Sequence, residues 1–120
     1  RAKTRQFAEV INSGIQPLQN LDVARRFSDD KLLQTQWCQH WIRRGLEACE
    51  MILRDSQLKK NRFCFADHPT LADICLIPQC YAALRNEIDL VSYPRIAAIY
   101  DYAKTTPEFR QSCPEAYQPV

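Results

Sequence analysis

The sequence has little glycine, no long apolar run and no marked excess of charge of one sign. Only two of its 120 residues are glycine, whereas 46% are hydrophobic. This balance favours helices over sheets or disorder, because glycine is costly inside a helix and common in turns. No apolar run approaches the roughly 20 residues of a membrane-spanning helix. The composition therefore predicts one helical domain without a membrane segment, long enough to form its own core.

Basic and acidic residues are interspersed along the chain. There are 16 lysines and arginines and 14 aspartates and glutamates, which gives a net charge of +2. A protein that binds nucleic acid usually carries a basic run or stripe, and none is visible in the sequence. We therefore expect neither nucleic acid nor a membrane among the partners of this protein.

The cysteines show no C-x-x-C pair and no zinc-ligand spacing. Most of the six have apolar neighbours at helical spacing, which is typical of reduced, buried thiols in a cytoplasmic protein. His40 and His68 have no visible set of partner residues, so we expect neither a metal ligand nor a general base at either position. The sequence thus predicts a cytoplasmic protein with no metal site.

Apolar residues recur with the period of a helix over most of the chain. Gly14 and Pro17 are expected to bend the first helix, since proline removes a backbone donor and crowds the preceding turn. Asp29 and Asp30 are expected to cap the second helix. Helices are expected over 1–26, from the cap at Asp29 and Asp30 to about 54, over 70–86, after Pro94, and briefly near 107–111. The fold class is therefore all-α, a helical bundle.

The best-defined helix start is at Thr70 and Asp73, which have the spacing of a capping box. A carboxylate in the first turn also suits the positive end of the helix dipole. The apolar run that follows predicts a helix that is buried on most sides. Both residues are expected to be structural, because a buried helix start without caps leaves backbone donors unpaired.

This region resembles the glutathione transferase superfamily, in which a T-x-A-D box opens the central helix of the C-terminal helical domain. The longer string is similar to the zeta class, which includes maleylacetoacetate isomerase and maleylpyruvate isomerase. Two other stretches in the same order along the chain carry the same resemblance. The matching strings are SGIQPLQNL at 13–21, TLADICLIPQ at 70–79 with YAALR at 81–85 and VSYP at 91–94, and PEAYQP at 114–119.

The resemblance implies a glutathione transferase C-terminal-like helical bundle spanning residues 1–120. Enzymes of this kind begin with a thioredoxin-like domain that binds glutathione and activates its thiol. The chain does not supply that domain, since it lacks an initiator methionine and starts inside an expected helix. We expect it to be the C-terminal domain of a longer enzyme, a homodimer, with no catalytic residue of its own and no activity alone.

The resemblance also implies which residues face the ligands. Read by spacing alone, Arg85 is a solvated arginine at a helix end, where it suits the dipole. In the zeta class the arginine at this place binds the substrate carboxylate, which a planar guanidinium matches with two hydrogen bonds. Residues at four further positions line the cleft for glutathione and substrate. These are Gln16, Asn20, Leu21 and Asp22, although a carboxylate at the last position departs from some members.

The expected activity is the glutathione-dependent cis–trans isomerisation of maleylacetoacetate to fumarylacetoacetate, in tyrosine and phenylalanine breakdown. Three alternatives stay open at this point. A relative could act on maleylpyruvate, or could be a general zeta-class transferase that removes halide from small α-halo acids. A non-enzymatic alternative is a docking module, because transferase-like helical domains also serve in assemblies.

Overall fold

The computed structural model describes residues 2–55 and 61–112, which form helices and connecting turns and, in these ranges, no strand. This confirms the all-α class. None of the described helices is long and apolar enough to cross a membrane. The elements are α1 (Ala2–Gly14), α2 (Leu21–Phe27), α3 (Lys31–Asp55), α4 (Leu71–Arg85), the 3-10 helix η1 (Leu90–Ser92), α5 (Pro94–Ala103) and α6 (Pro107–Ser112).

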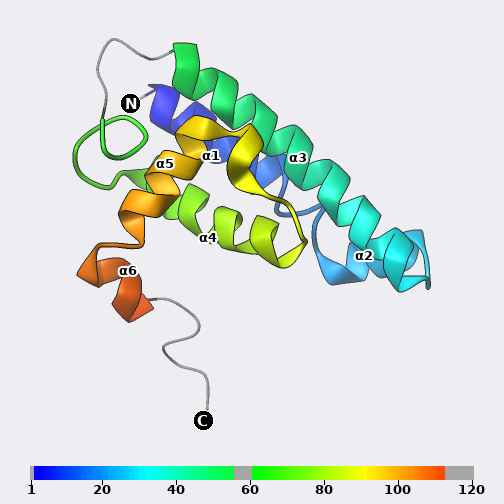
Figure 1. Cartoon of the computed structure of the whole chain (residues 1–120). Coiled ribbons are helices and arrows are strands. Elements are labelled where there is room, and N and C mark those ends of the chain that lie inside the picture. The colour runs from blue at the N-terminus through cyan, green and yellow to red at the C-terminus, as the bar shows by residue number, and fades with distance from the viewer. Residues whose placement is uncertain (1, 56–60, 113–120) are drawn as a thin grey trace.

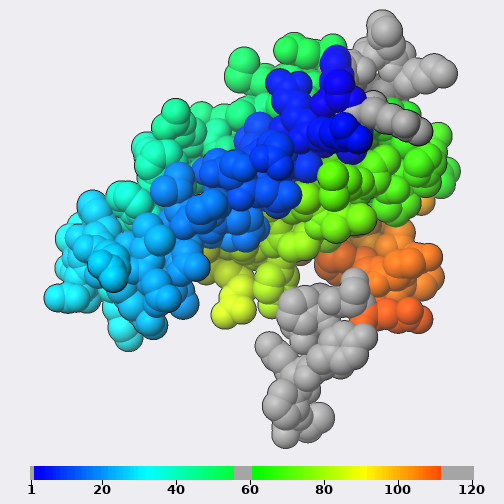
Figure 2. Space-filling model, turned by 180° about the vertical axis from the view of Figure 1, so that it is seen from behind, coloured from blue at the N-terminus to red at the C-terminus, as the bar shows by residue number. Residues whose placement is uncertain are grey.

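Helix α1 lies against both α3 and α4, on the side of the bundle that faces away from the viewer in Figure 1. From behind, it runs along the face between these two helices (Figure 2). Helix α5 packs on α3 and α4, while α2 and α6 lie at opposite ends of the molecule. The largest fully buried apolar side chains come from α1, α3, α4, α5 and the turn after α1: Phe7, Ile11, Ile15, Ile42, Leu46, Leu53, Leu76 and Ile96.

The expected single bent helix over 1–26 is wrong, because α1 ends at Gly14 and α2 begins at Leu21. Pro17 has no backbone N–H to continue the helix. Asn20 then starts a new one, since its side-chain oxygen accepts a hydrogen bond from the N–H of Asp22 at 2.8 Å. Residues 15–20 therefore form a short connection between two helices, which we call the α1–α2 connection.

The other expected helices are confirmed, with small shifts at their ends. The side chain of Asp30 accepts a hydrogen bond from the N–H of Leu32 at 2.8 Å and so caps α3. Pro94 occupies the first turn of α5, where a missing N–H costs nothing. The described cysteines are free thiols: Cys38, Cys49, Cys64, Cys75 and Cys80. Cys113 lies outside the described residues.

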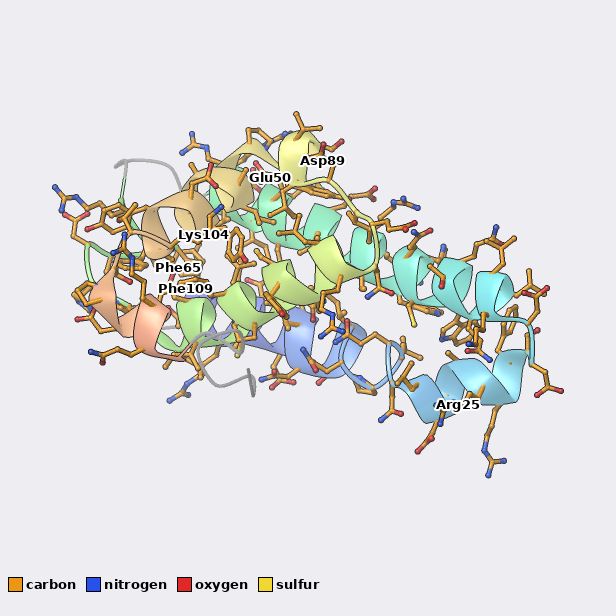
Figure 3. All side chains as sticks on the ribbon, turned by 60° about the horizontal axis from the view of Figure 1, so that its bottom comes forward. Arg25, Glu50, Phe65, Asp89, Lys104 and Phe109 are labelled. Atoms are coloured by element: carbon orange, nitrogen blue, oxygen red, sulfur yellow. The ribbon has the colours of Figure 1, made fainter. Side chains whose placement is uncertain are left out.

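The start of α5 is capped by a residue far away in sequence. Glu50 of α3 is 3% exposed, and its carboxylate accepts hydrogen bonds from the backbone N–H groups of Arg95 and Ile96 at 3.1–3.2 Å (Figure 3). Arg54, one turn along α3, lies 3.5 Å from the same carboxylate. A buried charge is stable only with such partners. This contact fixes the angle at which α5 crosses α3.

Gly45 of α3 faces Ile15 of the α1–α2 connection. A Cβ at this position would overlap the Cγ1 and Cδ1 atoms of Ile15, which is itself fully buried. Glycine in a helix normally costs about 1 kcal/mol relative to alanine. Its presence here is explained by the space that Ile15 needs.

We expect Gly45→Ala to lower the stability, because overpacking a core costs about 1–3 kcal/mol and outweighs the gain in helix propensity. Gly14→Ala is the matched control, since nothing lies within 4 Å of a Cβ at that site. Thermal unfolding of both variants gives the comparison. If Gly45→Ala unfolds at the same temperature as Gly14→Ala, Ile15 is not held as described.

Burial also makes stability depend on alkaline pH. It raises the pKa of the Cys49 thiol to about 12, with smaller contributions from Cys75 and Glu50. An unfolded thiol ionises near pH 8.5. Since the folded pKa is the higher one, the stabilisation is complete below about pH 8.5 and falls by about 1.4 kcal/mol per pH unit up to the folded pKa.

Cys49→Ala is therefore expected to reduce the pH dependence of the unfolding free energy by about one proton between roughly pH 9 and 11. The measurement is denaturant unfolding at several pH values. Ile42→Val serves as the control, because it also removes buried volume but no titratable group. Equal slopes for wild type and Cys49→Ala would show that the thiol ionises freely in the folded state.

Candidate functional site

The α1–α2 connection carries the first of the residues expected to face a ligand, and α3 holds its backbone from one side. The indole N–H of Trp37 donates a hydrogen bond to the carbonyl oxygen of Leu18 at 2.7 Å. The thiol of Cys38 donates to the carbonyl oxygen of Gln19 at 3.5 Å. Together with the buried Ile15, these bonds keep the connection in a single position on α3.

Helix α4 holds the same connection from the other side through Gln79, which is 0% exposed. The amide nitrogen of Gln16 donates to the oxygen of Gln79 at 2.9 Å, and the amide nitrogen of Gln79 donates to the oxygen of Gln19 at 2.9 Å. The sequence reasoning missed Gln79. One signal pointed to it: a glutamine on the same helical face as Leu76 and Ala83 is buried among apolar groups and needs partners.

The remaining expected residues of this group lie at the start of α2. Asn20 uses its side-chain oxygen to cap the helix, and Leu21 is 62% exposed. Asp22 lies on the surface, where Arg25 is 3.6 Å from its carboxylate. An ion pair as exposed as this one contributes little. Gln16 is exposed as well, so all four residues are accessible from solvent within one stretch of seven.

Arg85 is the last residue of α4 and is exposed. Its guanidinium carbon lies 5.9 Å from the centre of the Tyr81 ring. The helix end is tied to α3, because the Gln39 amide donates to the carbonyl oxygen of Asn86 at 2.7 Å. In the described part of the chain, no hydrogen bond or ion pair joins Arg85 to Gln16. Arg85 lies six residues beyond Gln79, the residue of α4 that Gln16 contacts.

One face of α4 is exposed, so the expectation that this helix is buried on most sides is wrong. Leu71 and Ile74 are 47% and 66% exposed, and Pro78 is exposed as well. These positions share a helical face with Tyr81 and Arg85, since their spacing of three or four residues matches the helical period. Leu71 and Ile74 therefore form an apolar stripe on α4 that nothing in the described part of the chain covers. Arg85 lies at the C-terminal end of this stripe.

The start of α4 is built around the carboxylate of Asp73, which is 0% exposed. It accepts hydrogen bonds from the backbone N–H and the hydroxyl of Thr70, at 2.9 and 3.1 Å, and from the N–H of Cys64 at 2.9 Å. The capping box is therefore formed, and it also anchors the turn before the helix. Burial, followed by the charge of Asp73, raises the pKa of the Cys64 thiol. The oxygens of Asp73 are thus engaged in contacts that hold the start of α4 and the turn before it.

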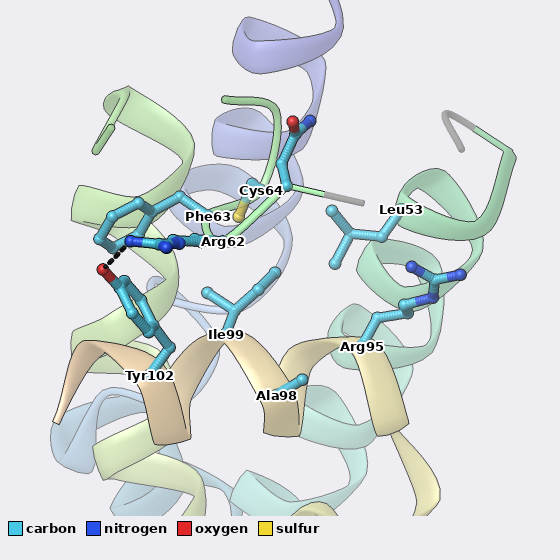
Figure 4. A pocket seen from close by; sticks show the side chains of 9 residues that line it. Leu53, Arg62, Phe63, Cys64, Arg95, Ala98, Ile99 and Tyr102 are labelled. Atoms are coloured by element: carbon cyan, nitrogen blue, oxygen red, sulfur yellow. Dashed lines mark hydrogen bonds between the residues drawn. The ribbon is translucent and has the colours of Figure 1, made fainter. Parts of the chain in front are cut away.

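A pocket of 190 Å³ lies between this turn and α5 (Figure 4). Its lining is largely apolar, and the guanidinium of Arg62 donates to the hydroxyl of Tyr102 at 3.2 Å. None of the expected site residues lines it. The His40 ring packs on Trp41, and His68 lies in an exposed turn. Within the described residues, no group of three or more histidine, cysteine or acidic side chains is placed to hold a metal ion.

Comparisons with known proteins agree on one group. The chain is 42% identical over 114 residues to "Probable maleylacetoacetate isomerase 2" of Drosophila melanogaster, covering 95% of this chain and 48% of that protein. It matches a crystal structure of maleylacetoacetate isomerase from Anaeromyxobacter dehalogenans with a TM-score of 0.89 and 38% identity, over 99% of this chain and 53% of that one. That structure has dicarboxyethyl glutathione and citrate bound in the active site.

A third match is the holo structure of maleyl pyruvate isomerase, described as a bacterial glutathione S-transferase of the zeta class. The TM-score is 0.90 and the identity 34%, over 99% of this chain and 57% of that one. No family model matches the chain. The chain spans about half the length of the curated relatives it matches and corresponds to their C-terminal half.

We expect Asp73→Ala to lower the unfolding free energy by about 2–3 kcal/mol, because it leaves the backbone donors of Cys64 and Thr70 unpaired in the interior. Asp22→Ala is the control, since that carboxylate is exposed and its ion pair is weak. Denaturant unfolding of the two variants measures the difference. Equal stabilities would show that the Asp73 contacts contribute nothing to the fold.

Proposed function

We propose that the chain belongs to the zeta class of the glutathione transferases and is the C-terminal domain of a glutathione-dependent maleylacetoacetate isomerase. The enzyme would convert maleylacetoacetate to fumarylacetoacetate in tyrosine and phenylalanine breakdown. The observation that carries the proposal is the likeness, over nearly all of this chain, to an isomerase that holds a glutathione conjugate in its active site. The exposed guanidinium of Arg85 supports it, because the substrate is a carboxylate.

We propose that a thioredoxin-like domain precedes this chain and packs on the exposed stripe of α4. The apolar side chains of Leu71 and Ile74 supply the surface for that contact. Such a domain would contribute the group that activates the thiol of glutathione. Residues 1–120 alone would then be inactive, since no residue placed in their site has that role.

Bound glutathione supplies a thiolate, which adds reversibly to the conjugated double bond of the substrate and so allows rotation about it. The residues of this chain bind and orient. Arg85 would pair with a carboxylate of the substrate, and its hydrogen bonds would hold the substrate while charge moves onto its oxygens. The stacking of Arg85 on Tyr81 keeps the guanidinium over the face of α4.

The residues of the α1–α2 connection and the start of α2 would line the glutathione part of the cleft. Gln16, Asn20, Leu21 and Asp22 are exposed together, and Gln16 still has its amide oxygen available for a ligand. Asn20 uses one side-chain atom in the helix cap and retains its amide nitrogen. Amide groups of this kind fit a tripeptide, which offers both donors and acceptors.

Isomerisation of maleylpyruvate is a second candidate, favoured by the equally close likeness in fold to maleyl pyruvate isomerase. Turnover of the two substrates side by side would separate these activities. Failure of the full-length protein to bind immobilised glutathione would instead favour a docking module. We also propose a homodimer, as the resemblance implies, and a cytoplasmic location, which the free thiols support.

Arg85→Ala in the full-length enzyme is expected to lower kcat/KM for maleylacetoacetate roughly 10- to 150-fold, because hydrogen bonds to charged groups contribute about 1.5–3 kcal/mol. The KM for glutathione should change far less. Arg85→Lys should recover part of the loss, since an ammonium keeps the charge but not the planar fork. The control for a general effect of charge is Arg43→Ala, because Arg43 is also an exposed arginine but lies on α3.

Steady-state kinetics with each substrate varied in turn decides the result. A rise in the KM for glutathione, with kinetics for the diketo acid unchanged, would place Arg85 in the glutathione part of the site and contradict this assignment.

A further inference from the structure

Gln79 sets the direction of a chain of three side-chain amides. A glutamine amide offers an acceptor oxygen and a donor nitrogen. The bonds run from the nitrogen of Gln16 to the oxygen of Gln79, and from the nitrogen of Gln79 to the oxygen of Gln19. Because Gln79 is 0% exposed, water does not compete for its amide, and both of its ends are engaged. The two outer amides are therefore oriented by the middle one.

This order decides what the α1–α2 connection presents to solvent. Gln16 is exposed, and its nitrogen is directed inward to Gln79, so its amide oxygen remains for a ligand. Gln19 is half-buried and engages its oxygen, so its nitrogen remains. The connection thus offers an acceptor at one end and a donor at the other. Its backbone is held separately by Trp37 and Cys38.

We propose that Gln79 is a positioning residue for glutathione binding, which acts by holding the Gln16 oxygen and the Gln19 nitrogen toward the ligand. The inference rests on the proposed function. An oriented acceptor at Gln16 suits an N–H donor of the tripeptide, either its ammonium group or a peptide N–H. Gln79 itself is buried and acts through Gln16 and Gln19. Fixing the amides before binding removes an ordering cost that a free glutamine would bring.

The first test is Gln79→Met in the full-length protein, with the dissociation constant for glutathione measured by calorimetry. Methionine has a similar length but no amide, so Gln16 and Gln19 are free to turn. We expect the dissociation constant to rise about 5- to 10-fold, which corresponds to roughly one hydrogen bond. The control is Gln34→Met, which removes a comparable bond, 2.8 Å to the carbonyl oxygen of Ser28, and should leave the constant unchanged.

The second test is Gln79→Glu, which separates positioning from a general effect on the fold. A protonated carboxyl has one donor and one acceptor and reproduces the pattern of the amide. The ionised form only accepts, so the Gln19 amide turns its nitrogen inward to the carboxylate and no longer offers it to the ligand. We expect the Gln79→Glu variant to bind glutathione with near wild-type affinity at about pH 5.5, where the buried carboxyl is protonated. At higher pH, where the carboxyl ionises, we expect it to bind several-fold more weakly than wild type measured at that same pH. If Gln79 had a merely structural role, the ratio of the variant's dissociation constant to that of wild type would not change with pH.

The outcomes are distinguishable. If the wild-type protein does not bind glutathione, the proposed function is overturned and this inference with it. If wild type binds but Gln79→Met binds within twofold of it, or if the Gln79→Glu ratio does not change with pH, the inference alone is overturned. A dissociation constant that rises in Gln79→Met and depends on pH in Gln79→Glu supports both.

Discussion

The carboxylate of Asp73 is the contact on which the position of α4 depends. It pairs the first turn of the helix with the N–H of Cys64, nine residues earlier, inside the core. A buried carboxylate is stable only when its oxygens are engaged, so the turn and the helix start form as one unit. Two residues of the candidate site, Gln79 and Arg85, lie on this helix, so their positions depend on its position.

The same principle recurs at two other places in the fold. Three polar side chains are buried in the described core, and each joins a helix to another segment. Asp73 holds the turn before α4, Glu50 caps α5, and Gln79 holds the α1–α2 connection. Unpaired backbone or side-chain groups in these places would cost more than the polar residues do. The bundle is thus packed by apolar residues and joined by these three.

Helix α4 has one face in the core and one in solvent, and the proposed function depends on both. Its buried face packs on α1, while the opposite face carries Leu71, Ile74 and Arg85 into solvent. A cleft between this face and a preceding domain would have Arg85 at one end and the α1–α2 connection along its side. In that arrangement the chain supplies binding groups, and the thiol chemistry comes from the partner domain.

The start of α4, the first turn of α5 and the helices after residue 30 could be predicted from the sequence alone. These depend on contacts between residues three or four apart, as in Thr70 and Asp73, or on the fixed backbone of Pro94. The sequence also placed Gln16 and Arg85 as candidates, through resemblance to a family. The break at 15–20 was missed, because Pro17 and the cap at Asn20 were read as a bend.

The remaining contacts depend on how the helices pack and could not be predicted from the sequence. Glu50 and the N–H of Ile96 are 46 residues apart, and Gln16 and Gln79 are 63 apart. Local spacing carries no signal for such pairs, since they form only when the helices pack. The exposed face of α4 is a further case. The apolar run from Ile74 to Ile77 does not show which of its side chains are buried by the rest of this chain and which stay exposed. Packing, and not periodicity, determined which face was left open.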